Sequence, residues 1–247
     1  MRTKVMQSLS SPLALVNAAH PIQGEHAPDL VAVDEHHPDI LLERRAAGLL
    51  NACIQAVGGR GQILPVSGWR SREEQQSIWD ETWAKEGEAF TRQYVALPGC
   101  SEHETGLAID LGLAGPDIDF IRPHFPDRGV CAAFKRRAAD YGFILRYPAG
   151  KEHITGIAHE PWHFRYVGAP HAGIMVRLGL ALEEYLDLLH QHPIDRPLCC
   201  RVQGRAFRIC RIEGGGPDDL AAQEDYSMVS RDNCGGWVLT SWKLEGW

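Results

Sequence analysis

The segment His159-Glu-Pro-Trp-His163 constrains the fold of this chain more than any other stretch of the sequence. It has the H-E-x-x-H spacing that, on a helix, places two histidines on one face to bind zinc, with the glutamate as base. Pro161 argues against a helix, because an interior proline removes a backbone hydrogen bond and clashes with the preceding turn, at a cost of about 3 kcal/mol. The residues from Trp162 to Tyr166 are rich in β-formers and lack helical periodicity. The segment therefore predicts a strand.

On a strand, the two histidines of this segment do not share one metal site. His159 and His163 would lie about 13 Å apart, at roughly 3.3 Å per residue. His163 then needs partners from elsewhere, and residues 101–110 offer them. Residues 108–110, Ala-Ile-Asp, have side chains in the alternating pattern of a strand. Gly106 permits a tight turn after His103. A helical site that uses both His159 and His163 is the competing interpretation.

The strand interpretation assembles a candidate zinc site from two segments. His103, Asp110 and His163 would supply two ring nitrogens and one carboxylate oxygen. Three protein ligands with a fourth position open to water is the arrangement of a catalytic zinc site. Zinc lowers the pKa of a bound water from 15.7 toward about 7. Glu160, three residues before His163, is placed to take a proton from that water and to pass it to the leaving amine.

The bulk properties are those of an ordinary globular protein. The 247 residues are 44% apolar and 23% charged, and suffice for one domain plus a modest appendage. The formal charge of -7, without a basic stripe, argues against nucleic acid as a partner. No apolar run reaches the roughly 20 residues of a membrane span. The longest apolar run near the N-terminus, Leu13 to Val16, is shorter than the roughly 7–15 residues of the hydrophobic segment of a signal peptide. We therefore expect a cytoplasmic protein unless a leader was removed.

Hydrophobic periodicity divides the chain into a mixed α and β part and a smaller β-rich part. It predicts helices over residues 40–57, 71–83, 130–141 and 174–189 and strands over residues 62–67 and 143–147. Ser71 and Glu74 form a capping box for the second of these helices. Short strands between glycine-rich turns are predicted over residues 207–212, 226–229 and 237–240. We therefore predict a catalytic domain over residues 13–192 and a small β-rich appendage over residues 193–247.

Four motifs, taken in their order along the chain, resemble those of the VanY/VanXY-type D-alanyl-D-alanine carboxypeptidases and dipeptidases, a family of zinc metallopeptidases. They are Ser67-Gly-Trp-Arg70-Ser with Gln75 beyond it, Ser101-Glu-His103-Glu-Thr-Gly106-Leu-Ala-Ile-Asp110, Tyr141-Gly-Phe-Ile-Leu-Arg-Tyr-Pro148 and Glu160-Pro-Trp-His163. In the first motif Trp69 replaces the usual tyrosine. The resemblance spans residues 13–189, and the four motifs together are far more specific than any one of them.

The resemblance implies an α+β fold shared with the hedgehog signalling domain, with an antiparallel sheet and flanking helices. It implies Zn²⁺ as the cofactor, bound by His103, Asp110 and His163, with Glu160 as the base.

The resemblance also implies roles for three further residues. Arg70 is expected to stabilise the oxyanion or to bind the substrate carboxylate, since its guanidinium offers a fixed fork of donors. Gln75 and Ser101 are expected to line the pocket for the terminal D-alanine.

The implied activity is hydrolysis of D-Ala-D-Ala bonds, as a carboxypeptidase, a dipeptidase or both, in cell-wall precursor metabolism and with a link to glycopeptide resistance. The implied partner is a small peptide that ends in D-Ala-D-Ala. One alternative is an endopeptidase that cuts an L-Ala-D-Glu bond of the cell wall, as related phage lysins do. Another is a binding module that keeps zinc without turnover, as hedgehog domains do. The presence of both Glu160 and Arg70 favours an enzyme, because a non-catalytic module has no chemical need of either.

Overall fold

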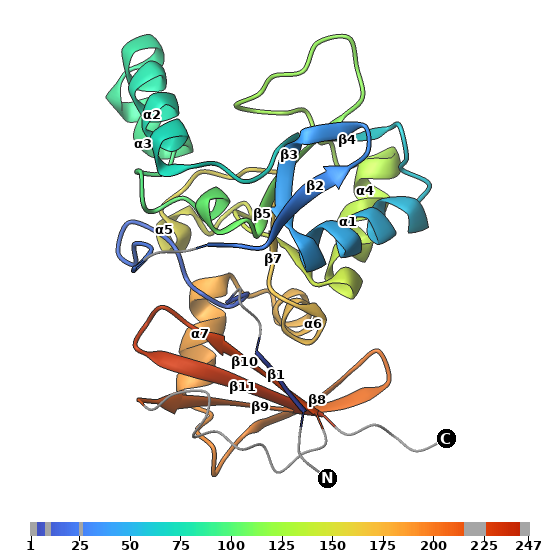
Figure 1. Ribbon diagram of the computed structural model, residues 1–247, viewed down its shortest axis with the longest axis vertical. Helices are drawn as coiled ribbons and strands as arrows, with labels where there is room; N and C mark the ends of the chain where they lie inside the picture. The colour runs from blue at the N-terminus through green and yellow to red at the C-terminus, as the bar shows by residue number, and fades with distance from the viewer. Residues whose placement is uncertain (1–3, 8–10, 25–26, 215–225, 243–247) are drawn as a thin grey trace.

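Two β-sheets lie on opposite sides of a pair of helices in this protein, whose structure is a computed structural model (Figure 1). It describes residues 4–7, 11–24, 27–214 and 226–242. The predicted fold class, a mixed α and β fold with an antiparallel sheet, flanking helices and additional C-terminal strands, is confirmed.

The four-stranded sheet carries two of the predicted zinc ligands. Its strand order is β4-β5-β7-β6, all antiparallel, with β4 (Ile63–Ser67), β5 (Ala108–Leu113), β6 (Phe143–Leu145) and β7 (His163–Tyr166). The hairpin of β2 (Leu30–Asp34) and β3 (His37–Glu43) lies next to β4. Helices α1 (Arg44–Ala56) and α4 (Gly129–Arg137) pack on this sheet through Leu50, Phe134 and Phe164, which are buried in one hydrophobic core.

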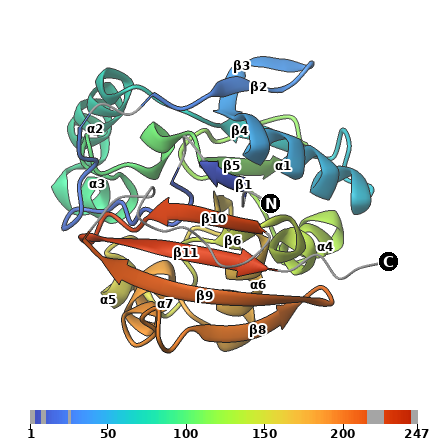
Figure 2. The same cartoon turned by 60° about the horizontal axis from the view of Figure 1, so that its bottom comes forward.

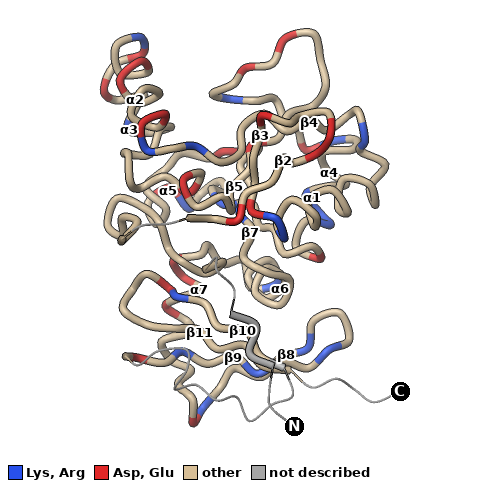
Figure 3. The backbone as a smooth tube through the Cα atoms, in the orientation of Figure 1, with Lys and Arg blue, Asp and Glu red and all other residues tan. Residues whose placement is uncertain are grey.

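Helices α2 (Arg72–Glu86) and α3 (Glu88–Tyr94) project from the sheet as a hairpin (Figures 1 and 2). The predicted capping box is confirmed: Ser71 Oγ accepts from the Glu74 N–H at 3.1 Å, and Glu74 Oε2 accepts from the Ser71 N–H at 2.7 Å. Figure 3 marks several acidic residues along α2. The remaining short helices are η1 (Glu102–Thr105), η2 (Ala138–Tyr141) and α5 (Glu152–Thr155). None of the described helices is long and apolar enough to cross a membrane.

The predicted helix over residues 71–83 extends to Glu86 as α2, and the one over residues 130–141 divides into α4 and η2. The other two predicted helices differ more from the structure. Residues 40–43 belong to β3, and α1 begins only after Glu43, whose side chain accepts from the Ala46 N–H at 2.9 Å. Leu41 and Leu42, just before Glu43, pair with Ala32 and Val31 of β2, so these apolar residues match a strand as well as a helix. The predicted helix over residues 174–189 is broken at Gly179, whose φ of +67° is left-handed. It becomes α6 (Ala169–Leu178) and α7 (Leu182–His190).

The five-stranded sheet packs on α6 and α7 through residues such as Ile209 and Val238 (Figure 2). Its strand order is β1-β10-β11-β9-β8, with β1 (Lys4–Gln7), β8 (Leu198–Val202), β9 (Arg205–Glu213), β10 (Tyr226–Arg231) and β11 (Gly236–Trp242). Strand β1 runs parallel to β10, whereas the other pairs are antiparallel. The sheet therefore includes β1, a strand from the beginning of the chain. The predicted appendage of residues 193–247 does not contain this strand.

A buried histidine joins the helix pair to the five-stranded sheet. His171 of α6 is fully buried, with Nδ1 2.8 Å from the Tyr185 hydroxyl on α7 and Nε2 3.0 Å from Thr240 Oγ1 on β11. Burial lowers the pKa of His171 to about 3. A neutral imidazole can donate at one nitrogen and accept at the other, so it satisfies both hydroxyl partners.

Acidification is expected to weaken this junction. The unfolded chain binds a proton at His171 below its ordinary pKa of about 6.5, whereas the folded chain binds one only near pH 3. The free energy of unfolding therefore decreases as the pH is lowered from about 6.5 to about 3. From pH 7 to pH 4 this one group should lower the free energy of unfolding by about 3 kcal/mol. Urea unfolding of the wild type and of His171→Gln at both pH values measures it. The variant should lose about 3 kcal/mol less than the wild type, and an equal loss would contradict the assignment.

Candidate metal centre and active site

Two neighbouring strands and one turn bring the three predicted ligands together. The register of β5 and β7 pairs Asp110 directly with His163. Opposed residues project from the same face of a sheet, with Cβ atoms about 4.5–5.5 Å apart. His103 lies in η1, just before β5, and Gly106 has a φ of +71° that glycine adopts without strain. This turn carries the chain from η1 into β5, as the sequence predicts.

The ligand atoms of the three residues lie within 4.8 Å of one another, and all three side chains are buried. His103 Nε2 is 3.2 Å from Asp110 Oδ2, and His163 Nδ1 is 3.0 Å from Asp110 Oδ1. Asp110 Oδ1 forms no hydrogen bond of acceptable geometry within the described part of the chain. A buried carboxylate whose two oxygens each face a ring nitrogen, one of them without such a bond, fits a metal ion.

The backbone fixes which nitrogen of His103 faces the site. Its Nδ1–H donates to the Gly68 carbonyl at 2.7 Å, so Nε2 keeps its lone pair. Burial, assisted by the Arg70 charge, lowers the pKa of His103 to about 4. The imidazole is therefore neutral at physiological pH, as a metal ligand must be.

Gly68 is a functional position that the sequence interpretation did not single out. A Cβ atom at this residue would lie 2.2 Å from the Leu41 carbonyl oxygen, so no other residue fits without a backbone shift. The Gly68 carbonyl can then approach His103. The available signal was a glycine directly after a predicted strand, inside the Ser67-Gly-Trp-Arg70 motif.

The electrostatics of the cluster favour a positive charge between the side chains. Burial would raise the pKa of Asp110, but His103 and His163 hold it well below its ordinary value. Burial would lower the pKa of His163, but its close contacts with the Asp110 and Glu102 carboxylates outweigh burial and raise it to about 9. The carboxylates thus stabilise a cation at this position, which a proton or a metal ion can supply.

Glu160 lies at the edge of the cluster, just before β7, and is 6% exposed. Its Oε2 is 3.7 Å from His163 Nδ1, and its N–H donates to the Tyr147 carbonyl at 3.0 Å. Burial raises the pKa of Glu160 to about 8, with the Asp110 charge adding to the shift and His163 opposing it. A carboxyl group with a pKa near neutrality can both accept and return a proton.

Arg70 reaches the cluster from the other side and is held by three contacts. Its Nε donates to Ser67 Oγ at 3.1 Å, its Nη1 donates to Gln75 Oε1 at 2.9 Å, and its Nη2 lies 3.4 Å from Asp110 Oδ2. Gln75 is 1% exposed and also donates to the Ala96 carbonyl at 2.8 Å. Gln75 therefore orients the guanidinium in addition to lining the cavity, a contact that the sequence did not predict.

One cavity of about 240 Å³ gathers all the predicted site residues. Its wall includes Arg70, Gln75, Ser101, His103, Asp110, Glu160 and His163. Ser101 is 2% exposed and its hydroxyl does not cap η1, so capping does not account for this residue. The structure brings these side chains together, and their individual roles remain predictions.

His159 lies outside the cluster. It is half-buried, and its Nδ1 is 2.9 Å from the Tyr147 carbonyl oxygen. Strand β7 begins at His163, and no helix contains both histidines. The competing helical site is therefore wrong, for the reason that Pro161 indicated.

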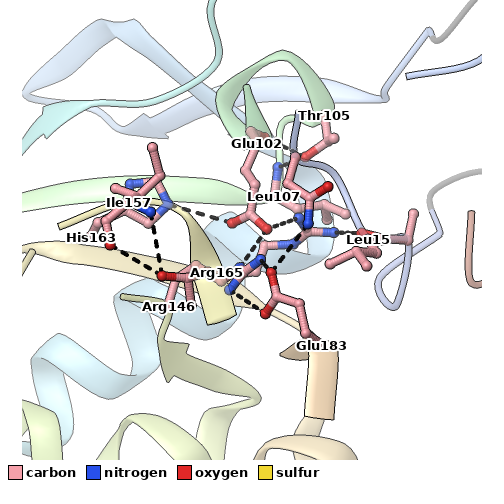
Figure 4. Close-up of polar contacts among 12 residues, drawn as sticks. Leu15, Glu102, Thr105, Leu107, Arg146, Ile157, His163, Arg165 and Glu183 are labelled. Carbon is pink, nitrogen blue, oxygen red and sulfur yellow. Dashed lines mark hydrogen bonds and ion pairs between the residues drawn. The ribbon is translucent and has the colours of Figure 1, made fainter. Parts of the chain in front are cut away.

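Three buried charges beneath the cluster were missed by the sequence interpretation. Glu102, Arg146 and Arg165 are at most 1% exposed, and both arginines pair with Glu102 Oε1, at 2.7 and 2.9 Å (Figure 4). Burial opposes ionisation of Glu102, yet Arg146 and Arg165 hold its pKa well below the ordinary value. Charged residues in a sequence normally indicate an exposed face. The signal available here was that both Glu102 and Arg146 lie within the motifs.

A buried His–Asp–His set beside a carboxylate and an arginine fits a metal-dependent hydrolase. Residues 39–169 match the family model described as VanY: D-alanyl-D-alanine carboxypeptidase. The chain belongs to this family.

Three relatives illustrate the similarity. The bifunctional D-Ala-D-Ala dipeptidase and carboxypeptidase VanXYC of Enterococcus gallinarum is 44% identical over 72% of this chain and 95% of its own length. The crystal structure of the vancomycin resistance D,D-dipeptidase VanXYg, in complex with a D-Ala-D-Ala phosphinate analog, has a TM-score of 0.89 and 41% identity over 95% of both chains. A VanY D,D-pentapeptidase mutant in complex with Zn(II) has a TM-score of 0.62 and 33% identity over 71% of this chain and 98% of its own.

Proposed function

We propose that this protein is a zinc-dependent peptidase that hydrolyses the D-Ala-D-Ala bond of small cell-wall peptides, as a dipeptidase and a carboxypeptidase. The observation that carries the proposal is the buried set of His103, Asp110 and His163 with Glu160 beside it in one cavity. The names of VanXYC and VanXYg support the substrate, and the Zn(II) complex of the VanY relative supports the metal. The VanXYg and VanY relatives are described as vancomycin resistance enzymes, which supports a place in glycopeptide resistance.

Zinc fits the donor set of the cluster, which offers two imidazole nitrogens and one carboxylate oxygen. When bound, zinc supplies Lewis acidity that makes a water molecule a proton donor near neutral pH. His103 presents Nε2 and His163 presents Nδ1, because Gly68 and Glu102 face their other nitrogens.

The side chains around the cluster have separate roles in proton transfer and in substrate binding. Glu160 accepts a proton from the attacking water and returns it to the amino group that leaves. Arg70, fixed by Ser67 and Gln75, donates hydrogen bonds to the developing oxyanion or to the terminal carboxylate of the peptide. Ser101 and Gln75 line the part of the cavity assigned to the terminal D-alanine.

We propose residues 13–192 as the catalytic domain and residues 193–247 as the appendage, of which residues 215–225 and 243–247 lie outside the described part. The extent of the VanXYC match supports this division. That relative aligns over 95% of its own length with only 72% of this chain, so more than a quarter of this chain has no counterpart there. The predicted cytoplasmic location rests partly on residues 1–3 and 8–10, which also lie outside the described residues.

A substrate panel tests the proposed activity. Release of free alanine of either configuration is measured with D-Ala-D-Ala, with a muramyl pentapeptide that ends in D-Ala-D-Ala, and with L-Ala-L-Ala as the stereochemical control. We expect release from the first two substrates and none from the third. Glu160→Gln protein purified in parallel excludes a contaminating peptidase.

The alternatives give different results when purified sacculi are added to the panel. Cleavage of purified sacculi without release of D-alanine from either peptide would indicate an endopeptidase for L-Ala-D-Glu bonds. Zinc-loaded protein that acts on none of these substrates would indicate a binding module.

A further inference from the structure

Glu102 lies beside the His163 ring, at the nitrogen that does not face Asp110 (Figure 4). His163 Nδ1 is 3.0 Å from Asp110, whereas its Nε2 is 3.5 Å from Glu102 Oε2. Neither Nε2 nor Oε2 forms a hydrogen bond of acceptable geometry in the described part of the chain, although both atoms are buried. Buried polar atoms are normally paired, and these two atoms face each other at 3.5 Å, so a small turn of the ring or of the carboxylate pairs both.

The other oxygen of Glu102 is fixed by two arginines. Arg146 Nε donates to Glu102 Oε1 at 2.7 Å, and Arg165 Nη1 lies 2.9 Å from the same oxygen. Because both cations gather on Oε1, the carboxylate is oriented with Oε2 toward His163. Arg165 and His163 are two residues apart on β7 and therefore project from the same face of the sheet.

The arginines are anchored in turn by parts of the chain outside the cavity. Arg146 forms a two-pronged pair with Glu183 of α7, at 2.9 Å from Nη1 and 2.7 Å from Nη2. Arg165 Nη2 donates to the carbonyls of Pro12 and Ala14, at 3.2 and 3.0 Å. The carboxylate beside His163 thus has little freedom to turn away.

We propose that Glu102 is a positioning residue: it holds the proton on His163 Nε2, so that Nδ1 presents its lone pair to the metal in a fixed ring orientation. This inference rests on the proposed function, because it needs His163 to be a zinc ligand. Carboxylates that accept from the second nitrogen of a ligating histidine commonly change metal affinity by about 10- to 100-fold. A carboxylate that only neutralises two buried arginines would change stability instead.

Two variants separate these roles. Glu102→Gln keeps the side-chain shape but removes the charge that faces Nε2. Glu183→Gln is the matched control, because Glu183 also pairs with Arg146 but does not contact His163. Zinc affinity is measured by competition with a chromophoric chelator, the ligand geometry by the absorption spectrum of the Co²⁺-substituted protein, and folding by thermal unfolding.

We expect Glu102→Gln to bind zinc about 10- to 100-fold more weakly than the wild type and to show an altered Co²⁺ spectrum. Glu183→Gln should keep both properties. Wild-type affinity in Glu102→Gln, or an equal loss in both variants, would overturn the proposal. If Glu102→Gln does not fold, Glu102→Asp carries the same test, because it keeps the charge but withdraws the oxygen from Nε2. Wild-type protein that binds no zinc would instead refute the proposed function.

Discussion

Replacing Glu160 by glutamine is expected to leave the protein folded and loaded with zinc but to lower kcat by at least about two orders of magnitude. The amide has the shape of the carboxylate and still fits the buried position, but it cannot accept a proton. Glu160 contacts the cluster only at 3.7 Å from His163, so its loss does not remove a proposed ligand. Its raised pKa of about 8 places the proton exchange close to neutral pH.

The measurement is kcat for D-alanine release, with zinc content determined on the same preparation. Glu152→Gln is the control, because Glu152 is an exposed carboxylate at the start of α5. A zinc-loaded Glu160→Gln protein with near-normal kcat would remove Glu160 from the mechanism. A variant that loses its zinc would show instead that Glu160 helps to hold the metal.

The parts of the site that lie near one another in the sequence could be predicted. Pro161 excluded a helix, and the alternation of residues 108–110 indicated the strand that carries Asp110. The capping box at Ser71 and the turn at Gly106 also depend on local contacts, and both are present. Such features follow from backbone geometry within a few residues, which the sequence contains in full.

The parts that depend on distant residues could not be predicted in the same way. Arg146 and Arg165 are 44 and 63 positions from Glu102, and nothing in their neighbourhoods indicates that they pair with it. The contact of β1 with β10 joins opposite ends of the chain. The break at Gly179 was missed because the apolar periodicity continues across it, although the glycine itself was visible.

Removal of His103 is expected to abolish zinc binding, whereas removal of His159 is expected to leave it almost intact. His103 Nε2 points into the cluster and is one of three ligand atoms, so His103→Ala leaves an incomplete site. His159 directs Nδ1 to the Tyr147 carbonyl, and its loss affects only that contact. His159→Ala should therefore keep zinc and lose at most a modest part of the activity.

Zinc per chain, measured by elemental analysis in the wild type, His103→Ala and His159→Ala after identical dialysis, tests the central claim most directly. The predicted result is about one zinc ion per chain in the wild type and in His159→Ala, and almost none in His103→Ala. Zinc retained in His103→Ala, or lost from His159→Ala, would contradict both the ligand set and the proposed zinc peptidase.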